Sequence, residues 1–199
     1  MAVKRFSTSL ISDSGQDKSS NFIANYSPAI DEMELISRVR VGSGGTSAIE
    51  FTNIPATFAH LQVRIIGKHS TTGNVQTGRI QFNGSTAANY AAHFLNGNGS
   101  ATGAGALTST SDPYGPILSS TSYSNVFGAS ILDILDYASA TKATTYRGFT
   151  GVDVNGSGGY VQMISGLWTN TSAVSSIKMY YSAANFAQHS TAALYGVKV

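Results

Sequence analysis

The stretch Arg79-Ile80-Gln81-Phe82-Asn83-Gly84 carries the pattern that decides the fold. Polar and apolar side chains alternate through its first four residues, which is the period of a β-strand with one buried face. The Asn-Gly pair that follows favours a tight turn. Residues 61–66, Leu-Gln-Val-Arg-Ile-Ile, show the same alternation. Both stretches therefore predict short strands of a half-buried sheet.

Similar short runs recur from Met33 to the end of the chain, with turn signals about every ten residues. We expect strands near residues 33–41, 48–51, 61–66, 79–82, 90–95, 131–137, 144–149, 160–168, 174–181 and 194–197. Residues 96–125 are expected to form a long loop, because Gly, Ala, Ser and Thr dominate there and Asp112-Pro113-Tyr114-Gly115-Pro116 favours turns. Nine to eleven short strands without a long helix predict an all-β fold, an antiparallel β-sandwich that is jelly-roll-like.

Composition narrows the class of protein. The chain has 199 residues, of which 11% are charged, with 28 serines, 19 threonines and a net charge of +2. This charge is too small to indicate direct nucleic-acid binding. The absence of cysteine excludes disulfides and thiolate metal sites. No apolar run reaches 18 residues, so no membrane insertion is predicted.

The first 32 residues differ from the rest of the chain. They are short polar runs interrupted by large apolar residues: Phe6, Leu10, Ile11, Phe22, Ile23 and Tyr26. A solvated tail is normally polar. We therefore expect residues 1–32 to form an extended anchoring arm that docks these side chains on another subunit, and residues 33–199 to form the sandwich domain. A disordered tail, or a strand packed on its own domain, is the alternative.

Side chains for catalysis or metal binding are not found in a recognisable pattern. The four histidines lack a second ligand at metal-binding spacing. Asp133 and Asp136 lie three residues apart and would point to opposite faces of a strand, so we expect them at a sheet edge or a cap rather than as a glycosidase pair. The sequence thus predicts no catalytic, cofactor-binding or metal residue, and no enzyme.

Two aromatic residues are candidates for contact with a surface ligand. Trp168 could form a sugar-stacking platform at a sheet rim, although a core position is favoured for it. Tyr114, within the expected loop, is the second possible surface-contact residue.

Several runs resemble, in their order and spacing, a module found in virion proteins of tailed bacteriophages. The first is Ser37–Val63, which begins Ser-Arg-Val-Arg-Val-Gly-Ser-Gly-Gly. Others follow at residues 82–85, 89–90, 127–137, 165–168 and 185–197, so that the likeness covers about residues 35–199. The opening Met1–Thr8 is similar to the leader of such proteins, which are most familiar in phages of aquatic bacteria, including cyanophages.

The resemblance implies a virion structural protein that is assembled in the host cytoplasm. It does not decide between two locations in the virion. One is a capsid decoration or cement protein, a head accessory protein whose arm binds other virion proteins such as the major capsid protein or a tail component. The alternative is a short tail fibre or receptor-binding protein that recognises a host surface glycan. Long tail fibres carry sequence repeats that form a shaft, and none is visible here, so the capsid location is favoured.

The sequence also leads to an expectation for the oligomeric state. We expect a homotrimer in which apolar residues of neighbouring sandwiches meet around the axis, because virion appendages follow the local symmetry of the particle. No cofactor is expected.

Overall fold

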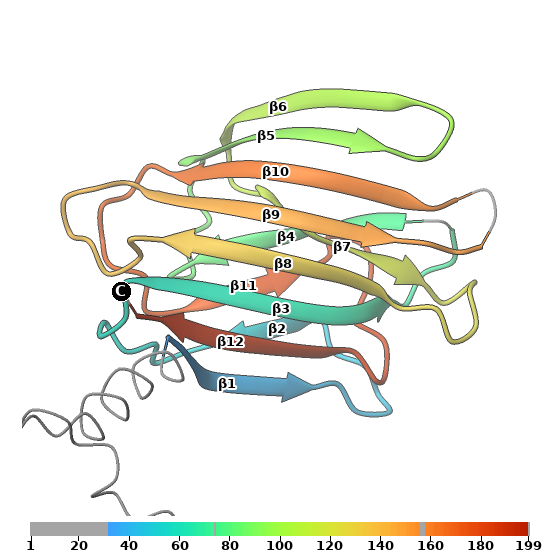
Figure 1. Ribbon diagram of the computed structural model, residues 1–199, viewed down its shortest axis with the longest axis horizontal. Helices are drawn as coiled ribbons and strands as arrows, with labels where there is room; N and C mark the ends of the chain where they lie inside the picture. The colour runs from blue at the N-terminus through green and yellow to red at the C-terminus, as the bar shows by residue number, and fades with distance from the viewer. Residues whose placement is uncertain (1–31, 74, 156–157, 199) are drawn as a thin grey trace, which may run out of the picture.

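The computed structural model describes residues 32–73, 75–155 and 158–198, and the regular elements in this part of the chain are all β-strands (Figure 1). None of the described residues forms a helix long and apolar enough to cross a membrane. The strands are β1 (Met33–Arg40), β2 (Ala48–Phe51), β3 (His60–His69), β4 (Val75–Phe82), β5 (Tyr90–Gly97), β6 (Thr102–Thr110), β7 (Tyr114–Ser120), β8 (Gly128–Leu135), β9 (Thr144–Val152), β10 (Tyr160–Trp168), β11 (Ile177–Tyr180) and β12 (Thr191–Val197).

The strands form two layers, with the smaller one behind the larger in Figure 1. The large sheet has the order β1-β12-β3-β8-β9-β10-β5-β6, and all its neighbours are antiparallel. The small sheet has the order β2-β11-β4-β7, also antiparallel. A short parallel pairing of β7 with β3 joins the layers at one end.

The connectivity is that of a jelly roll. Strands β1 to β4 alternate between the two layers, as do β7 and β8, and then β11 and β12. The order β1-β12-β3-β8 in one layer, facing β2-β11-β4-β7 in the other, is the eight-stranded double Greek key. The expected all-β jelly-roll sandwich is thereby confirmed. Two hairpins, β5–β6 and β9–β10, extend only the large sheet, which becomes twice as wide as the small one.

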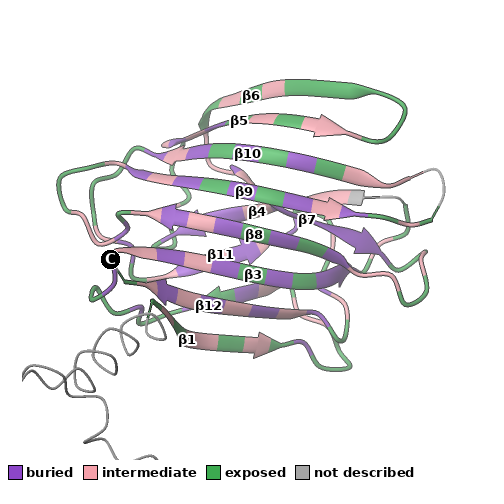
Figure 2. Cartoon of the chain, in the orientation of Figure 1, coloured by how far each residue is buried: buried purple, intermediate pink, exposed green. Residues whose placement is uncertain are grey.

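The core lies between the layers. Along β3, for example, Leu61, Val63 and Ile65 are fully buried while Arg64 and Ile66 are exposed. Figure 2 shows the same alternation of buried and exposed positions along β8, β9 and β10. Burying each such large apolar side chain contributes about 1.5–3 kcal/mol, so this alternation supplies most of the driving force for folding.

The expectation of a long loop over residues 96–125 is wrong. The structure places β6 and β7 there, so the described residues contain twelve strands. The glycines of β6 allow side chains of β5 to approach its backbone closely, and they do not mark a loop. A Cβ on Gly105 would lie 2.6 Å from the ring of Phe94, and one on Gly103 would lie 2.5 Å from Oδ1 of Asn96. In β7, Pro116 is accommodated because β7 bulges there: Gly115 and Pro116 together lie opposite the single residue Gly78 of β4.

The expected arm falls outside this description, apart from its last residue. Phe6, Leu10, Ile11, Phe22, Ile23 and Tyr26 lie outside the described residues. Glu32 precedes β1, and its carbonyl accepts a hydrogen bond of 3.0 Å from the backbone N–H of Lys198. The arm therefore joins the sandwich at the β1 edge of the large sheet.

Gly166 of β10 offers a test of the packing. It pairs with Tyr146 of β9, whose ring lies over it, so that a Cβ at this position would be 2.0 Å from the ring. We expect Gly166→Ala to lower the free energy of unfolding by about 1–3 kcal/mol, because the buried ring must shift. Gly42→Ala is the control, since no heavy atom lies within 4 Å of its Cβ position. Urea unfolding measures both, and equal stabilities would contradict the packing described.

Candidate functional site

The side of the large sheet that faces away from the small sheet, here called the outer face, is uncovered by the described chain. Strand β8 illustrates its construction: Leu132 and Ile134 point inward and are buried, whereas Ile131 and Asp133 point outward. Because neighbouring strands are in register, outward residues of successive strands line up across the sheet. The result is two adjacent rows of side chains of different chemistry.

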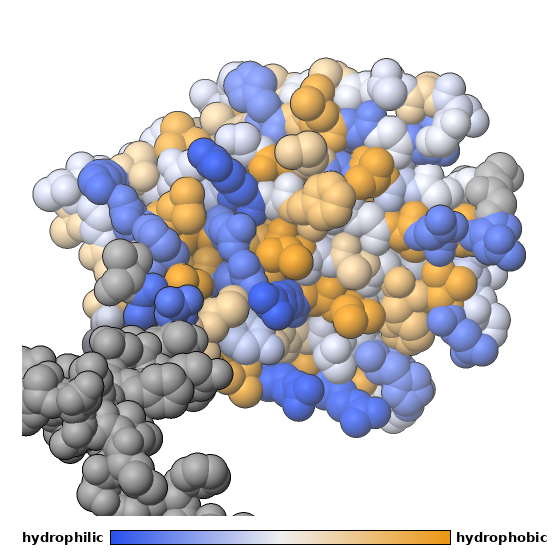
Figure 3. Space-filling view, viewed as in Figure 1, coloured by the Kyte–Doolittle hydropathy of each residue, from blue (hydrophilic) through white to orange (hydrophobic). Residues whose placement is uncertain are grey.

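The first, the apolar row, runs across β8, β9, β10 and β5. Ile131 pairs with Phe149, Phe149 with Met163, and Met163 with Leu95. These four side chains are between 42% and 62% exposed. Figure 3 shows apolar side chains gathered on this face over the middle of the sheet. Monomeric proteins rarely leave four large apolar neighbours uncovered, so the row indicates an interaction surface.

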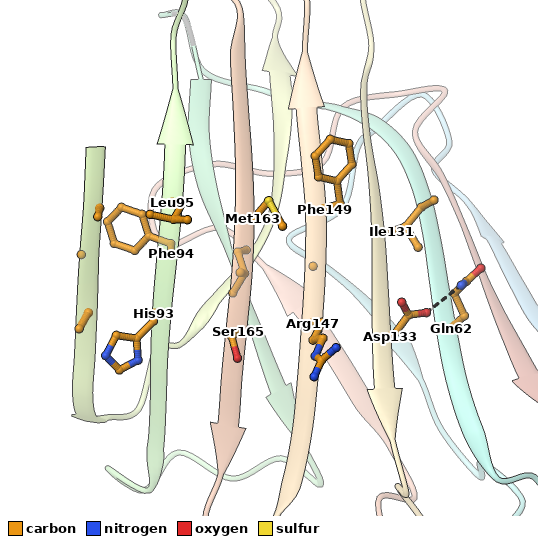
Figure 4. Close-up of a pocket in the computed structure, with 15 residues that line it drawn as sticks. Gln62, His93, Phe94, Leu95, Ile131, Asp133, Arg147, Phe149, Met163 and Ser165 are labelled. Atoms are coloured by element: carbon orange, nitrogen blue, oxygen red, sulfur yellow. Dashed lines mark hydrogen bonds between the residues drawn. The ribbon is translucent and has the colours of Figure 1, made fainter. Parts of the chain in front are cut away.

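The second, the polar row, lies two residues further along each strand, about 6.8 Å away. It consists of outward residues of β3, β8, β9, β10 and β5, paired in the order Gln62, Asp133, Arg147, Ser165 and His93. Figure 4 shows the two rows side by side, with His93, Ser165 and Arg147 along one level and Leu95, Met163 and Phe149 along the other.

The two ends of the polar row differ in their hydrogen bonding. At the β3 end, the Gln62 side-chain amide donates to Oδ1 of Asp133 at 2.7 Å, and Nε of Arg64 donates to Oε1 of Gln62 at 2.7 Å. In contrast, the side chains of Arg147, Ser165 and His93 make no hydrogen bond or ion pair with other described residues. Arg147 lies opposite Asp133 in register, but the carboxylate is bonded to Gln62. Three polar side chains thus remain available to a ligand.

A groove with a volume of about 1120 Å³ lies over these rows. Small residues of β6, namely Ala104, Gly105 and Ala106, line its far end together with Phe94. The described residues that line it include no lysine and no glutamate. The groove therefore offers an apolar strip, a cationic guanidinium and hydrogen-bonding groups within one open surface.

Two titratable groups elsewhere are buried for structural reasons. Burial lowers the pKa of Lys68, whose ammonium donates a hydrogen bond to the carbonyl of Tyr123. Burial likewise lowers the pKa of His69, whose Nδ1 bonds the Thr71 hydroxyl at 2.9 Å. No group of three His, Asp or Glu residues that could hold a metal ion is found in the part of the chain described.

The structure places Trp168 in the core and not on a surface platform at a sheet rim. Its side chain is only 1% exposed and stacks on Tyr90, with ring centroids 6.1 Å apart, so it cannot contact a surface ligand. The favoured core position is the right one, since Trp168 is an inward residue of β10. Tyr114 is half-buried at the start of β7, where its ring meets Phe94 edge-on at 5.0 Å. It thus supports a residue of the groove.

Of the two aspartates, Asp133 differs from the expected edge or cap position. Asp133 is not at an edge, because β8 lies between β3 and β9 in the large sheet. Asp136 lies in the turn after β8, where the Lys142 ammonium donates to its carboxylate at 2.7 Å and lowers its pKa. The structure does not bring these two carboxylates together as a catalytic pair.

The sequence contains one signal for the site. Ile131-Leu132 and Ile134-Leu135 are apolar on both faces of the strand around Asp133. A strand of this kind is either buried on both sides or exposes apolar side chains on one. The partners of Ile131 in the row, however, come from strands whose register is not readable from the sequence.

Comparison with known proteins adds little to the geometry. No protein-family model matches the chain, and no curated protein matches it. One solved structure, the crystal structure of a putative pore-forming toxin from Bacteroides vulgatus ATCC 8482, aligns with 78% of this chain at 6% identity and a TM-score of 0.06. This chain spans about half the length of that protein, 52% of it. At this TM-score the alignment carries no argument.

Single substitutions of apolar-row residues by serine should leave the free energy of unfolding almost unchanged. We expect Phe149→Ser and Met163→Ser to change the free energy of unfolding by no more than about 0.5 kcal/mol, because both side chains are 58% exposed. The same variants should bind less of a hydrophobic dye such as ANS. Phe82→Ala, at a fully buried position, is the contrasting control and should cost about 3–5 kcal/mol. A large loss of stability in the surface variants would show that the row is part of the core.

Proposed function

We propose that this protein is a bacteriophage virion structural protein, a capsid decoration or cement protein that acts by binding other protein subunits. The observation that carries the proposal is the apolar row on the uncovered outer face of the large sheet. A row of Ile131, Phe149, Met163 and Leu95 gains free energy only when another surface excludes water from it.

The composition of the outer face supports a protein partner. Phenylalanine, methionine and arginine are enriched at protein–protein interfaces, whereas lysine and glutamate are depleted. The groove is lined by Phe149, Met163 and Arg147 and by no lysine or glutamate among the described residues. Its chemistry is that of an interface core flanked by polar groups.

The N-terminal arm supports anchoring within a particle. Its six large apolar side chains need a surface to bury them, and the resemblance to phage virion modules supplies the setting, a particle of repeated subunits. We propose that the arm binds another subunit of the particle while the jelly roll remains on the outside. The homotrimer remains a prediction of the same proposal.

Deleting residues 1–31 tests the anchoring role. The truncated chain keeps Glu32, whose carbonyl bonds Lys198, so its melting temperature should change by no more than about 2 °C. Its incorporation into particles of the source phage should fall at least about tenfold relative to the tagged full chain, measured by quantitative mass spectrometry of purified particles. Antibody labelling should place the full chain on the head.

Two outcomes would contradict the proposal. Absence of the full chain from purified particles would rule out a virion protein. Normal incorporation of the truncated chain would place the anchor outside the arm.

A tail-fibre or receptor-binding role is the second candidate, and the free part of the polar row favours it. Arg147, Ser165 and His93 have no hydrogen-bond partner among the described residues and form a row next to the apolar row that contains Phe149. Guanidinium, hydroxyl and imidazole groups next to an aromatic ring can bind an acidic sugar.

Titration calorimetry with acidic and neutral oligosaccharides from the host surface tests this role. A receptor-binding protein should bind an acidic oligosaccharide, and Arg147→Ala should weaken binding at least about tenfold. Arg40→Ala, an exposed arginine at the far edge of the sheet, should leave it unchanged. Absence of binding, together with labelling of the head, would exclude this candidate.

A further inference from the structure

We infer that the groove on the outer face of one copy binds the N-terminal arm of a neighbouring copy, through residues 6–13. The inference rests on the proposed function, in which the arm binds another subunit. It assigns the first part of the arm to a second copy of this chain and leaves Phe22, Ile23 and Tyr26 to bind other virion proteins. The proposed occupant is a segment of this chain, and the chemistry of the segment and of the groove can be compared directly.

The first point is hydrophobic complementarity. The apolar row requires an occupant with apolar side chains, and residues 6–11 carry Phe6, Leu10 and Ile11 among serines and threonine. The segment has no glycine or proline, so it can adopt an extended conformation without a break. In an extended segment Leu10 and Ile11 point to opposite sides, so the association buries Ile11 against the row and leaves Phe6 and Leu10 on the other side of the segment.

The second point is the spacing of charge. In an extended segment Asp13 lies two residues beyond Ile11, about 6.8 Å away. Arg147 likewise lies two residues from Phe149 on β9, so the polar and apolar rows have the same separation. When Ile11 covers Phe149, Asp13 therefore reaches the guanidinium of Arg147. This arginine makes no ion pair with any described residue, and a carboxylate from the arm would provide one.

The third point is the backbone of the bound segment. An extended segment lying on a sheet face has no ladder partner, and unpaired N–H and C=O groups are costly when buried. The side chains of Ser165 and His93 continue the polar row next to Arg147 and are free of hydrogen bonds to described residues. Ser165 is the register neighbour of Arg147, so its hydroxyl can donate to or accept from the backbone of the segment beside Asp13.

The fourth point is reach. Glu32 precedes β1, at the opposite edge of the sheet from β6. Ile11 lies 21 residues before it, a distance of up to about 70 Å when extended. A domain of this size is about 40 Å across. The arm is therefore long enough to extend across a neighbouring sandwich and to place residues 6–13 on it. Phe22, Ile23 and Tyr26 lie within 11 residues of Met33, where β1 begins, and stay nearer to their own sandwich.

The symmetry of this contact fits a ring. An arm from one copy that enters the groove of the next is a heterologous contact, which closes when the rotation between copies is a simple fraction of a turn. Three copies would each give one arm and receive one, and no groove would remain open. The homotrimer expected from the sequence would then be held together by exchanged arms.

A charge exchange in the full-length protein tests the inference. We expect wild-type protein to be trimeric in light scattering at micromolar concentration, and Arg147→Asp or Asp13→Arg to weaken association at least about tenfold each. The double variant carrying both changes should recover most of the association, because the ion pair is restored with opposite polarity. Arg40→Asp, at an exposed position outside the groove, is the control for a change of net charge.

A second pair of variants tests the apolar contact. Phe149→Ser and Ile11→Ser should each weaken association at least about tenfold, and combining them should add little, because both remove the same contact. Ile66→Ser is the matched control, since Ile66 is 55% exposed on the same face but does not line the groove. Equal effects of Ile66→Ser and Phe149→Ser would overturn the assignment of the groove.

Photocrosslinking identifies the occupant. A benzophenone side chain at position 163, in a mixture of isotope-labelled and unlabelled full chains, should form crosslinks to a peptide of residues 6–18 from the other copy. Crosslinks only within one copy, or to residues of another sandwich, would overturn the inference. A full chain that is monomeric, while deletion of the arm still prevents incorporation into particles, would also overturn it but leave the proposed function intact.

Discussion

One phenylalanine ring holds the extended half of the large sheet against the small sheet. Phe82, at the end of β4, contacts the rings of Tyr90, Tyr146 and Trp168, with centroids 6.3, 5.8 and 5.8 Å away. These three residues belong to β5, β9 and β10, the strands that widen the sheet beyond the jelly roll. The backbone N–H of Phe82 also donates to the Tyr90 hydroxyl at 2.9 Å. The position of the outer face therefore depends on this cluster.

The same cluster sets the register on which the site depends. Tyr146 can lie flat over β10 only because its partner there is Gly166, and this fixes β9 against β10. With that pairing in place, Phe149 must lie next to Met163 and Arg147 next to Ser165. A slip of one residue would turn the apolar row into the core and expose the buried residues. The buried aromatic packing and the outer face are two consequences of one register.

Much of the fold was predictable from local sequence, and much of the site was not. Alternation over residues 61–66 and 79–82 predicted β3 and β4 because each strand has one buried face. β6 was not predicted, because its glycines make room for Phe94 and Asn96 on β5. This contact depends on the three-dimensional fold and is not visible in the local sequence pattern. The core position favoured for Trp168 agrees with the structure, in which the rings of Tyr90 and Phe82 pack against it.

The rows themselves arise from strands far apart in the chain, such as β5 and β10. Leu95 and Met163 become neighbours only through a register that no single strand specifies. The low net charge argued against direct nucleic-acid binding, but composition could not indicate which apolar residues stay outside. Arg147 illustrates the limit: nothing in Tyr146-Arg147-Gly148 distinguishes it from the other exposed arginines.

The direction of the apolar row also explains how the chain can expose it. Each of the four strands contributes a single large apolar side chain to the row, and the outward residue two positions away on the side of the polar row is polar, as Asp133 is for Ile131 and Arg147 for Phe149. On β10 the outward Val161 also neighbours Met163, but Ser165 follows, so none of the four strands exposes a long continuous apolar segment of the kind that drives edge-to-edge or cross-β association. The continuous apolar strip exists only across strands, after the sheet has formed in register. A partner that recognises the strip thus binds the folded sandwich and has no equivalent surface on the unfolded chain, which couples assembly to folding.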